Sequence, residues 1–347
     1  MRILTPEIDI AYDKTTTLKA GVSYVVEPRA AGALLMRLDG LASVEGCELP
    51  AYNRKADYNG KTLTILRAGG IGDILLITPL IEAIQAEWPE VKLEVCCSNR
   101  SELGVHALCS HLPYPTPHSE LLKRDAILNL TNSVEEDHDL HAVHVFGAKA
   151  GFYDLPLRLK YQNDKALVGD MLIRYPKRAK VRVGIQMKAS SKIRSYPYMS
   201  AVIAGLIEKG VEAVLFDEPE ATSVIGQSEL ILNGSTEKWT LEESVALLES
   251  CDLIIAPDSA FIHFGCALNV ATLGLYGSFH YSKRATLGNP KNFFIQAGGD
   301  CSPCNHHGSG GLAWPKGGPC NRSGMCNVLH GIEPERVVRK AMQLCSA

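Results

Sequence analysis

Long apolar runs and an excess of one charge are both missing from this chain of 347 residues. No apolar stretch approaches the roughly 20 residues that a membrane-spanning helix requires. The segment Met1–Tyr12 mixes Arg2, Glu7 and Asp9 with short apolar stretches, and so lacks the apolar core of a signal peptide. A formal net charge of -3 provides no global basic field, which argues against a general nucleic-acid binder. We therefore expect a cytoplasmic protein without a transmembrane segment.

Internal repeats and low-complexity tracts are also absent from the sequence. Hydrophobic residues make up 46% of the chain and charged residues 21%, which is ordinary for a globular protein and unlike a disordered or fibrous chain. A single hydrophobic core rarely fills a chain of this length, so two domains are expected.

Cysteine, by contrast, is plentiful, with 11 residues. Without a secretion signal, cysteines are interpreted first as thiols or metal ligands rather than disulfides. Four of them are expected to lie in the core as small hydrophobic residues: Cys96, Cys97, Cys251 and Cys266. Four others surround a glycine-rich loop: Cys301, Cys304, Cys320 and Cys326. These four thiolates could enclose a structural zinc ion, or they could be reduced thiols of a flexible loop.

Short apolar runs alternate with helical patterns from residue 61 onward, which is typical of a parallel sheet covered by helices. The expected strands are Leu63–Arg67, Lys92–Cys97 and Ala126–Thr131, and then Val181–Ile185, Val211–Phe216, Leu253–Ala256 and Ala271–Tyr276. A polar, proline-containing stretch from Leu155 to Lys180 separates the two series and is the expected linker. The pattern predicts two doubly wound lobes, whose ligands bind outside the carboxyl ends of the strands.

The predicted organisation has four parts. They are an N-terminal extension at 1–55, a first Rossmann-like lobe at 56–175, a second lobe at 176–333 with a cysteine-rich loop at 301–326, and a C-terminal helix at 334–347. Within the extension, residues 28–41 are expected to form a helix and residues 43–59 to be irregular.

The first motif is a glycine turn that ends in Asp73. The strand that ends at Arg67 runs into Gly69, Gly70 and Gly72 and then directly into a helix. Glycines let backbone amides approach a ligand at a helix N-terminus, where the dipole favours anions. The turn lacks the third glycine of a dinucleotide fingerprint, and Asp73 could instead be a first-turn acid that complements the helix dipole.

The second motif follows the strand Leu253–Ala256. Asp258, Ser259 and Ala260 begin a helix, so the amides and the serine hydroxyl could hold a pyrophosphate. His263 lies four residues after Ser259, on the same helical face, and could donate to a phosphate oxygen. The alternative is that Asp258 and Ser259 only cap the helix and that His263 is a buried structural histidine.

The two motifs together resemble those of glycosyltransferase family nine, the ADP-heptose:lipopolysaccharide heptosyltransferases. The matching stretches run from Ile65 through Asp73 to Leu80, and from Leu241 through Asp258, Ser259 and His263 to Gly277. The resemblance covers residue 61 to the C-terminus. It implies the GT-B fold, in which two Rossmann-like lobes face a cleft, with the first lobe binding the acceptor and the second the nucleotide-sugar donor.

The resemblance also implies roles for individual residues. Asp73 takes the place of the base that deprotonates the acceptor hydroxyl, whereas Asp258, Ser259 and His263 take the places that bind the donor diphosphate. Ala260 stands where the family usually has glycine. The family's basic stretch, ending in Lys-x-Trp-Pro, is similar to 192–197 here, so that Lys192 or Arg194 would neutralise the leaving diphosphate.

We therefore predict an inverting, metal-independent glycosyltransferase that moves a sugar from a nucleoside-diphosphate sugar, with ADP-sugars favoured, to a saccharide hydroxyl. Gly70 and Gly72 are added to the predicted donor-binding residues. The one Asp-x-Asp pair, Asp137 and Asp139, is interpreted as a solvated loop rather than a metal clamp. Two alternatives remain: transfer to an unusual acceptor such as a modified DNA base or a protein, and a nucleotide-sugar epimerase or binding protein on the same fold.

Overall fold

The computed structural model describes residues 1–13, 16–38, 40–98, 108–136, 139–191, 193–216, 228–285, 289–299, 302–304 and 326–346. The chain divides into two compact units. The first comprises residues 1–137 and 143–155, and the second comprises residues 138–142 and 156–347. Among the described residues, no helix is long and apolar enough to cross a membrane.

The first unit is built on a parallel sheet of four strands in the order β10-β6-β7-β8. Its strands are β6 (Thr62–Leu66), β7 (Lys92–Ser98), β8 (Ser110–Tyr114) and β10 (Ala126–Asn129). The helices that follow these strands are α2 (Ile71–Leu76), α3 (Thr78–Glu87), α4 (His118–Leu121), α5 (Ser133–Glu136) and α6 (Ala142–Ala150). Parallel strands require crossover connections, and α2 with α3 supplies the one between β6 and β7.

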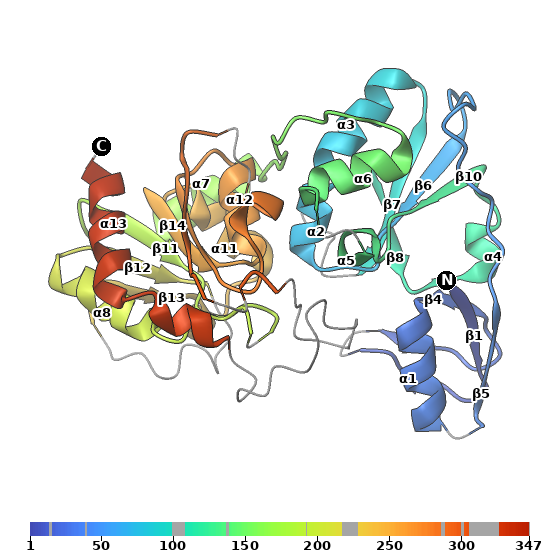
Figure 1. The fold of residues 1–347 in the computed structure, drawn as a ribbon, viewed down its shortest axis with the longest axis horizontal. Coiled ribbons are helices and arrows are strands. Elements are labelled where there is room, and N and C mark those ends of the chain that lie inside the picture. The colour runs from blue at the N-terminus through green and yellow to red at the C-terminus, as the bar shows by residue number, and fades with distance from the viewer. Residues whose placement is uncertain are drawn as a thin grey trace. The chain divides into compact units, whose positions relative to one another are not determined.

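Pro79 divides one helical pattern into α2 and α3 (Figure 1). Pro79 has no N–H to donate to the carbonyl of Leu75. The Thr78 hydroxyl donates to that carbonyl instead, at 2.7 Å, so the buried oxygen keeps a partner. The break therefore leaves α2 as a short helix that carries Asp73 in its first turn.

The N-terminal residues form a second, antiparallel sheet of the first unit, with the order β5-β1-β4-β9. Its strands are β1 (Arg2–Pro6), β4 (Tyr24–Val26), β5 (Ala42–Gly46) and β9 (Thr116–Pro117). A two-stranded pair is made by β2 (Ile10–Ala11) and β3 (Thr17–Leu18). The predicted helix is confirmed as α1 (Pro28–Leu38), but the expectation that residues 43–59 are irregular is wrong at β5. Because β4 pairs with β9 from the middle of the unit, these residues are part of its fold.

The second unit contains a parallel sheet of six strands in the order β13-β12-β11-β14-β15-β16 (Figure 1). Its strands are β11 (Arg182–Ile185), β12 (Glu212–Leu215), β13 (Ile231–Asn233), β14 (Leu253–Pro257), β15 (Thr272–Tyr276) and β16 (Asn292–Gln296). Its helices are α7 (Lys165–Arg174), α8 (Met199–Glu208), α10 (Gly234–Glu237), α11 (Leu241–Leu248), α12 (Ala260–Ala267) and α13 (Pro334–Ser346), with 3-10 turns η2 (Tyr281–Lys283) and η3 (Asn327–Gly331). The N-terminus of α11 has a capping box, in which Thr240 and Glu243 exchange side-chain to backbone hydrogen bonds. The stretch expected to be a linker contains α7.

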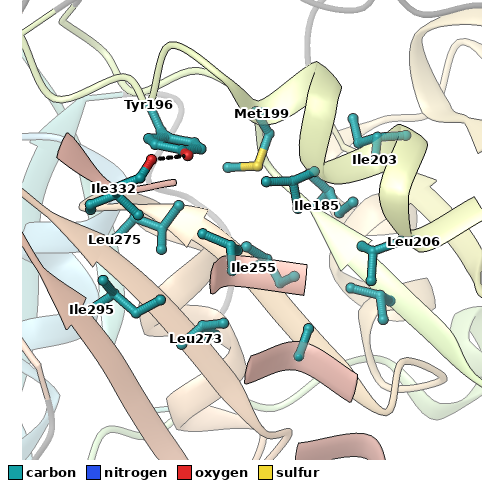
Figure 2. Close-up of a cluster of buried hydrophobic side chains, with 14 of the residues drawn as sticks. Ile185, Tyr196, Met199, Ile203, Leu206, Ile255, Leu273, Leu275, Ile295 and Ile332 are labelled. Atoms are coloured by element: carbon teal, nitrogen blue, oxygen red, sulfur yellow. Dashed lines mark hydrogen bonds between the residues drawn. The ribbon is translucent and has the colours of Figure 1, made fainter. Parts of the chain in front are cut away.

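Both faces of this six-stranded sheet are covered by helices, as the run of fully buried strand residues requires. One face packs against α8 and α13, and its core is drawn in Figure 2. This core includes Ile185, Met199, Ile203, Leu206, Ile255, Leu273, Leu275 and Ile295. The other face meets α12, where a side chain at Gly265 would collide with Thr272. Burial of each large aliphatic side chain contributes about 1.5–3 kcal/mol and fixes the strand ends that carry the polar residues described next.

Candidate functional site

In the first unit, polar groups gather at the carboxyl end of β6. Arg67 directly follows this strand, and its guanidinium Nη2 lies 3.2 Å from Oδ2 of Asp73. The Arg67 side chain is 0% exposed, whereas that of Asp73 is 21% exposed. The guanidinium also donates to the carbonyl of Leu130 at 3.2 Å and lies 5.4 Å from the ring centre of Phe146. A buried cation therefore holds a carboxylate that remains open to solvent.

The glycine turn positions the Asp73 carboxylate. The Gly70 N–H donates to Oδ2 of Asp73 at 3.3 Å, and the Asp73 N–H donates to the Gly70 carbonyl at 3.0 Å. A Cβ at Gly69 would come within 2.9 Å of both Arg67 Nε and Asp73 Oδ2, whereas a Cβ at Gly70 would meet nothing within 4 Å. Gly69 is thus the glycine that the ion pair requires. Gly72 lies inside the first turn of α2.

Asp73 has the geometry of a first-turn acid and, in addition, a charged partner. It sits in the first turn of α2 and bonds back to Gly70, as a helix-capping acid does. It also has a buried arginine partner, which a simple cap does not need. The carboxylate is held in one orientation and is accessible to solvent.

In the second unit, the equivalent edge of the sheet lies where β14 ends and α12 begins. Asp258 is 5% exposed, and Ser259 is the N-cap of α12. Arg194 reaches this point from the loop between β11 and α8. Its Nη1 donates to the Asp258 carbonyl at 3.1 Å and lies 3.5 Å from Asp258 Oδ2. A second Arg194 nitrogen donates to the Ser190 hydroxyl.

The structure therefore brings Arg194 together with Asp258, Ser259 and Ala260 at one helix N-terminus. The Nε of Arg194 is buried and has no hydrogen-bond partner among the described residues. Lys192, the other predicted cation of this loop, lies outside the described residues. An arginine at the N-terminus of a helix creates a binding site for an anion, because the guanidinium and the helix dipole both favour negative charge.

Gln186 is a site residue that the sequence did not reveal. Its side-chain oxygen accepts hydrogen bonds from the Ser259 hydroxyl and from the N–H of Phe261, the latter at 3.3 Å. Gln186 follows β11, and β11 pairs with β14, so the two strand ends lie together. The only signal in the sequence was a polar residue directly after a buried strand. Since the Ser259 hydroxyl is engaged by Gln186, the amides of Ser259 and Ala260 are the better candidates for holding a phosphate.

Further buried polar groups belong to α12 and to the end of β15. His263 is 4% exposed and faces the interior. Burial, and secondarily the charge of Asp258, raises the pKa of the Tyr276 hydroxyl well above its usual value. The Ser278 hydroxyl, just after β15, is buried without a hydrogen-bond partner in the part of the chain described here. Tyr276 and Ser278 are further site neighbours that the sequence did not single out.

The predicted metal ligands lie partly outside the described residues. Cys301 and Cys320 lie outside the described residues, whereas Cys304 is half-buried and Cys326 is buried. Of the Asp-x-Asp pair, Asp137 is outside and Asp139 inside the described residues. Within the described ranges, no group of three or more histidine, cysteine or acidic residues could hold a metal ion. The predicted core cysteines are confirmed as buried: Cys96, Cys97, Cys251 and Cys266.

Known proteins resemble this chain in sequence pattern and in fold. The model of glycosyltransferase family 9 (heptosyltransferase) matches residues 126–311. No curated protein matches the sequence. Among solved structures, Escherichia coli ADP-heptose lipopolysaccharide heptosyltransferase II is similar with a TM-score of 0.62 and 17% identity, over 82% of this chain and 98% of that one.

Two further structures have the same fold. The family 9 glycosyltransferase from Veillonella parvula DSM 2008 is similar with a TM-score of 0.61 and 14% identity, over 84% of this chain and 99% of that one. The dodecameric iron-containing heptosyltransferase TibC, in complex with ADP-D-β-D-heptose, has a TM-score of 0.61 and 16% identity, over 99% of this chain and 90% of that one. TibC comes from enterotoxigenic E. coli H10407.

Proposed function

Because the chain belongs to glycosyltransferase family 9 and has the GT-B fold of that family, we propose that it is an inverting, metal-independent transferase with Asp73 as its general base. The observation that carries this proposal is the Asp73 carboxylate, paired with buried Arg67 and still 21% exposed. In this proposal the first unit supplies the base and the second unit supplies the anion site.

The proposed donor is an ADP-sugar, with ADP-heptose as the first candidate. TibC is described in complex with ADP-D-β-D-heptose, and the E. coli heptosyltransferase WaaC with ADP-2-deoxy-2-fluoro heptose. In this chain the diphosphate would lie at the N-terminus of α12. The amides of Ser259 and Ala260 would donate to it, and Arg194 would neutralise its charge.

The chemistry follows from where charge develops. As the bond between the anomeric carbon and the diphosphate breaks, negative charge grows on the leaving group, and Arg194 with the helix N-terminus stabilises it. The sugar develops oxocarbenium character and is attacked from the opposite face by the acceptor hydroxyl. Asp73 accepts the hydroxyl proton during that attack. A single displacement of this kind inverts the anomeric configuration.

We propose that this chemistry needs no metal ion. The positive charge of Arg194 and the dipole at the N-terminus of α12 would stabilise the diphosphate in place of a cation. A structural ion is a separate matter. Cys301, Cys304, Cys320 and Cys326 are the proposed ligands, and thiolates bind zinc or iron. TibC is described as containing iron, so elemental analysis of the purified protein should identify which metal is present.

The proposal is tested by measuring release of nucleoside diphosphate. ADP-, GDP- and UDP-sugars would each be incubated with saccharide, DNA and protein acceptors. The expected result is ADP release from an ADP-sugar that depends on a saccharide acceptor. Release dependent on DNA or protein would identify an unusual acceptor, and conversion of the sugar without any acceptor would contradict transfer and indicate an epimerase.

A further inference from the structure

The loop that carries Arg194 is tied to the segment that follows the cysteine-rich loop. The hydroxyl of Tyr196, two residues after Arg194, donates to the carbonyl of Ile332 at 2.6 Å. Figure 2 shows this bond, with the ring of Tyr196 near Leu275. Tyr196 is 3% exposed, so its hydroxyl bonds to this carbonyl in place of the water that it would contact in the unfolded chain.

A second bond joins the same two segments. The Tyr198 hydroxyl lies 2.9 Å from Nδ1 of His330, and the two rings meet edge to face with centroids 5.3 Å apart. Tyr198 is 38% exposed. The two bonds differ in environment, so the buried Tyr196 bond is the stronger restraint on the loop.

The cysteine-rich loop also meets the end of β15, next to the donor site. The Ser302 hydroxyl donates to the Gly277 carbonyl at 2.7 Å. A Cβ at Gly277 would lie 2.6 Å from Leu329 and 3.3 Å from Cys326 Sγ, so the backbone approaches η3 closely. Both described flanks of this loop, 302–304 and 326–332, therefore rest against elements whose ends form the proposed donor site.

We propose that Tyr196 is a positioning residue for donor binding, whose hydroxyl anchors the Arg194 loop to Ile332 and so keeps the guanidinium at Asp258. This inference rests on the proposed role of Arg194 at the diphosphate. Contacts on two sides hold Arg194 in place. Arg194 is held at its tip by Asp258 and Ser190, while its backbone is held from the other side through Tyr196. Loss of the anchor lets the cation move away from the helix N-terminus.

The test uses Tyr196→Phe, which removes the hydroxyl and keeps the buried ring. ADP binding would be measured by calorimetry, together with KM and kcat for the donor, and inorganic pyrophosphate would serve as a second probe of the same site. Loss of one buried hydrogen bond predicts an increase in Kd and donor KM of about three- to tenfold, and kcat should fall by no more than a similar factor, since Arg194 also stabilises the leaving group. The melting temperature of each variant would verify folding.

Tyr175→Phe is the matched control. The Tyr175 hydroxyl donates to Glu237 at 3.0 Å, and Tyr175 lies near the amino end of β11, where its carbonyl accepts from Arg182. This variant loses a tyrosine hydrogen bond in the same unit but away from Arg194. Its ADP affinity should remain that of wild type.

A double-mutant cycle with Arg194→Gln separates the possible outcomes. If Tyr196 acts through Arg194, the double variant should bind ADP no more weakly than Arg194→Gln alone. If Tyr196→Phe binds ADP with normal affinity while Arg194→Gln binds it more weakly, the positioning role is overturned and the proposed function remains intact. Fully additive losses of ADP affinity in the double variant would have the same consequence. Normal binding by Arg194→Gln would overturn both this inference and the proposed diphosphate site.

Discussion

At the scale of single residues, the Arg67–Asp73 pair explains why the glycine turn carries a carboxylate. Burying a guanidinium is costly unless its hydrogen bonds and charge are compensated. Here the Leu130 carbonyl, the Phe146 ring and the Asp73 carboxylate share that task. In the proposed mechanism, Asp73 is the partner that exchanges a proton, and it is also the partner that solvent reaches.

Replacing Arg67 with Met should lower kcat/KM, because the ion pair that holds the Asp73 carboxylate in place is lost. We expect a loss of about tenfold or more, and a smaller one for Arg67→Lys, which keeps the charge. The measurement is kcat/KM for the three proteins, with melting temperatures as a check on folding. A wild-type kcat/KM in Arg67→Met would argue that the ion pair does not position a catalytic base.

Individual site residues were harder to predict from the sequence than the fold. Asp73 and Ser259 stood out because each directly follows a strand and begins a helix. Arg67 lies at the end of an apolar run, where the pattern predicts the last residue of a strand. Gln186 and Tyr196 act through partners about 70 and 140 residues away, and no local pattern reports such contacts.

At the scale of elements, the turn between β6 and α2 works because its glycines are not equivalent. Gly69 faces the ion pair, and Gly70 faces open space while its N–H holds Asp73. The short α2, ended by the break before Pro79, then presents Asp73 from its first turn. The geometry therefore assigns a distinct effect to each glycine.

Gly69→Ala should reduce activity strongly, whereas Gly70→Ala should be tolerated. The added methyl at position 69 would press on both Arg67 and Asp73 and displace the carboxylate, which costs about tenfold or more in kcat when a catalytic group is misplaced. At position 70 the methyl meets nothing within 4 Å. Transfer rates and melting temperatures of the two variants would be compared. Equal losses in both would show that the turn binds phosphate through close backbone approach instead.

Most central strands and long helices were predictable, because buried parallel strands are continuous apolar runs and helices have caps. The missed strands have physical reasons. β8 is an edge strand that contains Pro113, and β13 and β16 are only partly buried. The N-terminal strands are short, and β4 pairs with β9 some 90 residues away, so their sheet depends on contacts that local periodicity does not encode.

At the scale of the whole molecule, each unit places its polar residues at the carboxyl ends of a parallel sheet, as doubly wound sheets do. The alternation of strands and helices was sufficient to predict this for both units. The family resemblance added the assignment of acceptor and donor roles. Neither could show that the flanks of the cysteine-rich loop rest against Gly277 and Tyr196, because that loop has no periodic pattern.

A chelator added to the assay should leave the initial transfer rate within about twofold of the untreated enzyme, because in the proposed mechanism Arg194 and the α12 N-terminus stabilise the leaving diphosphate. Slow removal of a cysteine-bound ion should instead lower the melting temperature. Initial rates with EDTA, followed by elemental analysis, would distinguish these effects. Immediate loss of activity that Mg²⁺ or Mn²⁺ restores would show that a divalent ion takes part in the chemistry.

The most direct test of the central claim is the transfer rate of Asp73→Asn at saturating donor. Asparagine keeps the shape of the side chain but cannot accept the acceptor proton, so the rate should fall by about 10²- to 10⁴-fold while ADP affinity is retained. Asp57→Asn is the control, because Asp57 caps a surface turn of the same unit by accepting hydrogen bonds from the backbone and side-chain N–H groups of Asn59. Transfer by Asp73→Asn at the wild-type rate would contradict the account, since the proposed base would then be dispensable.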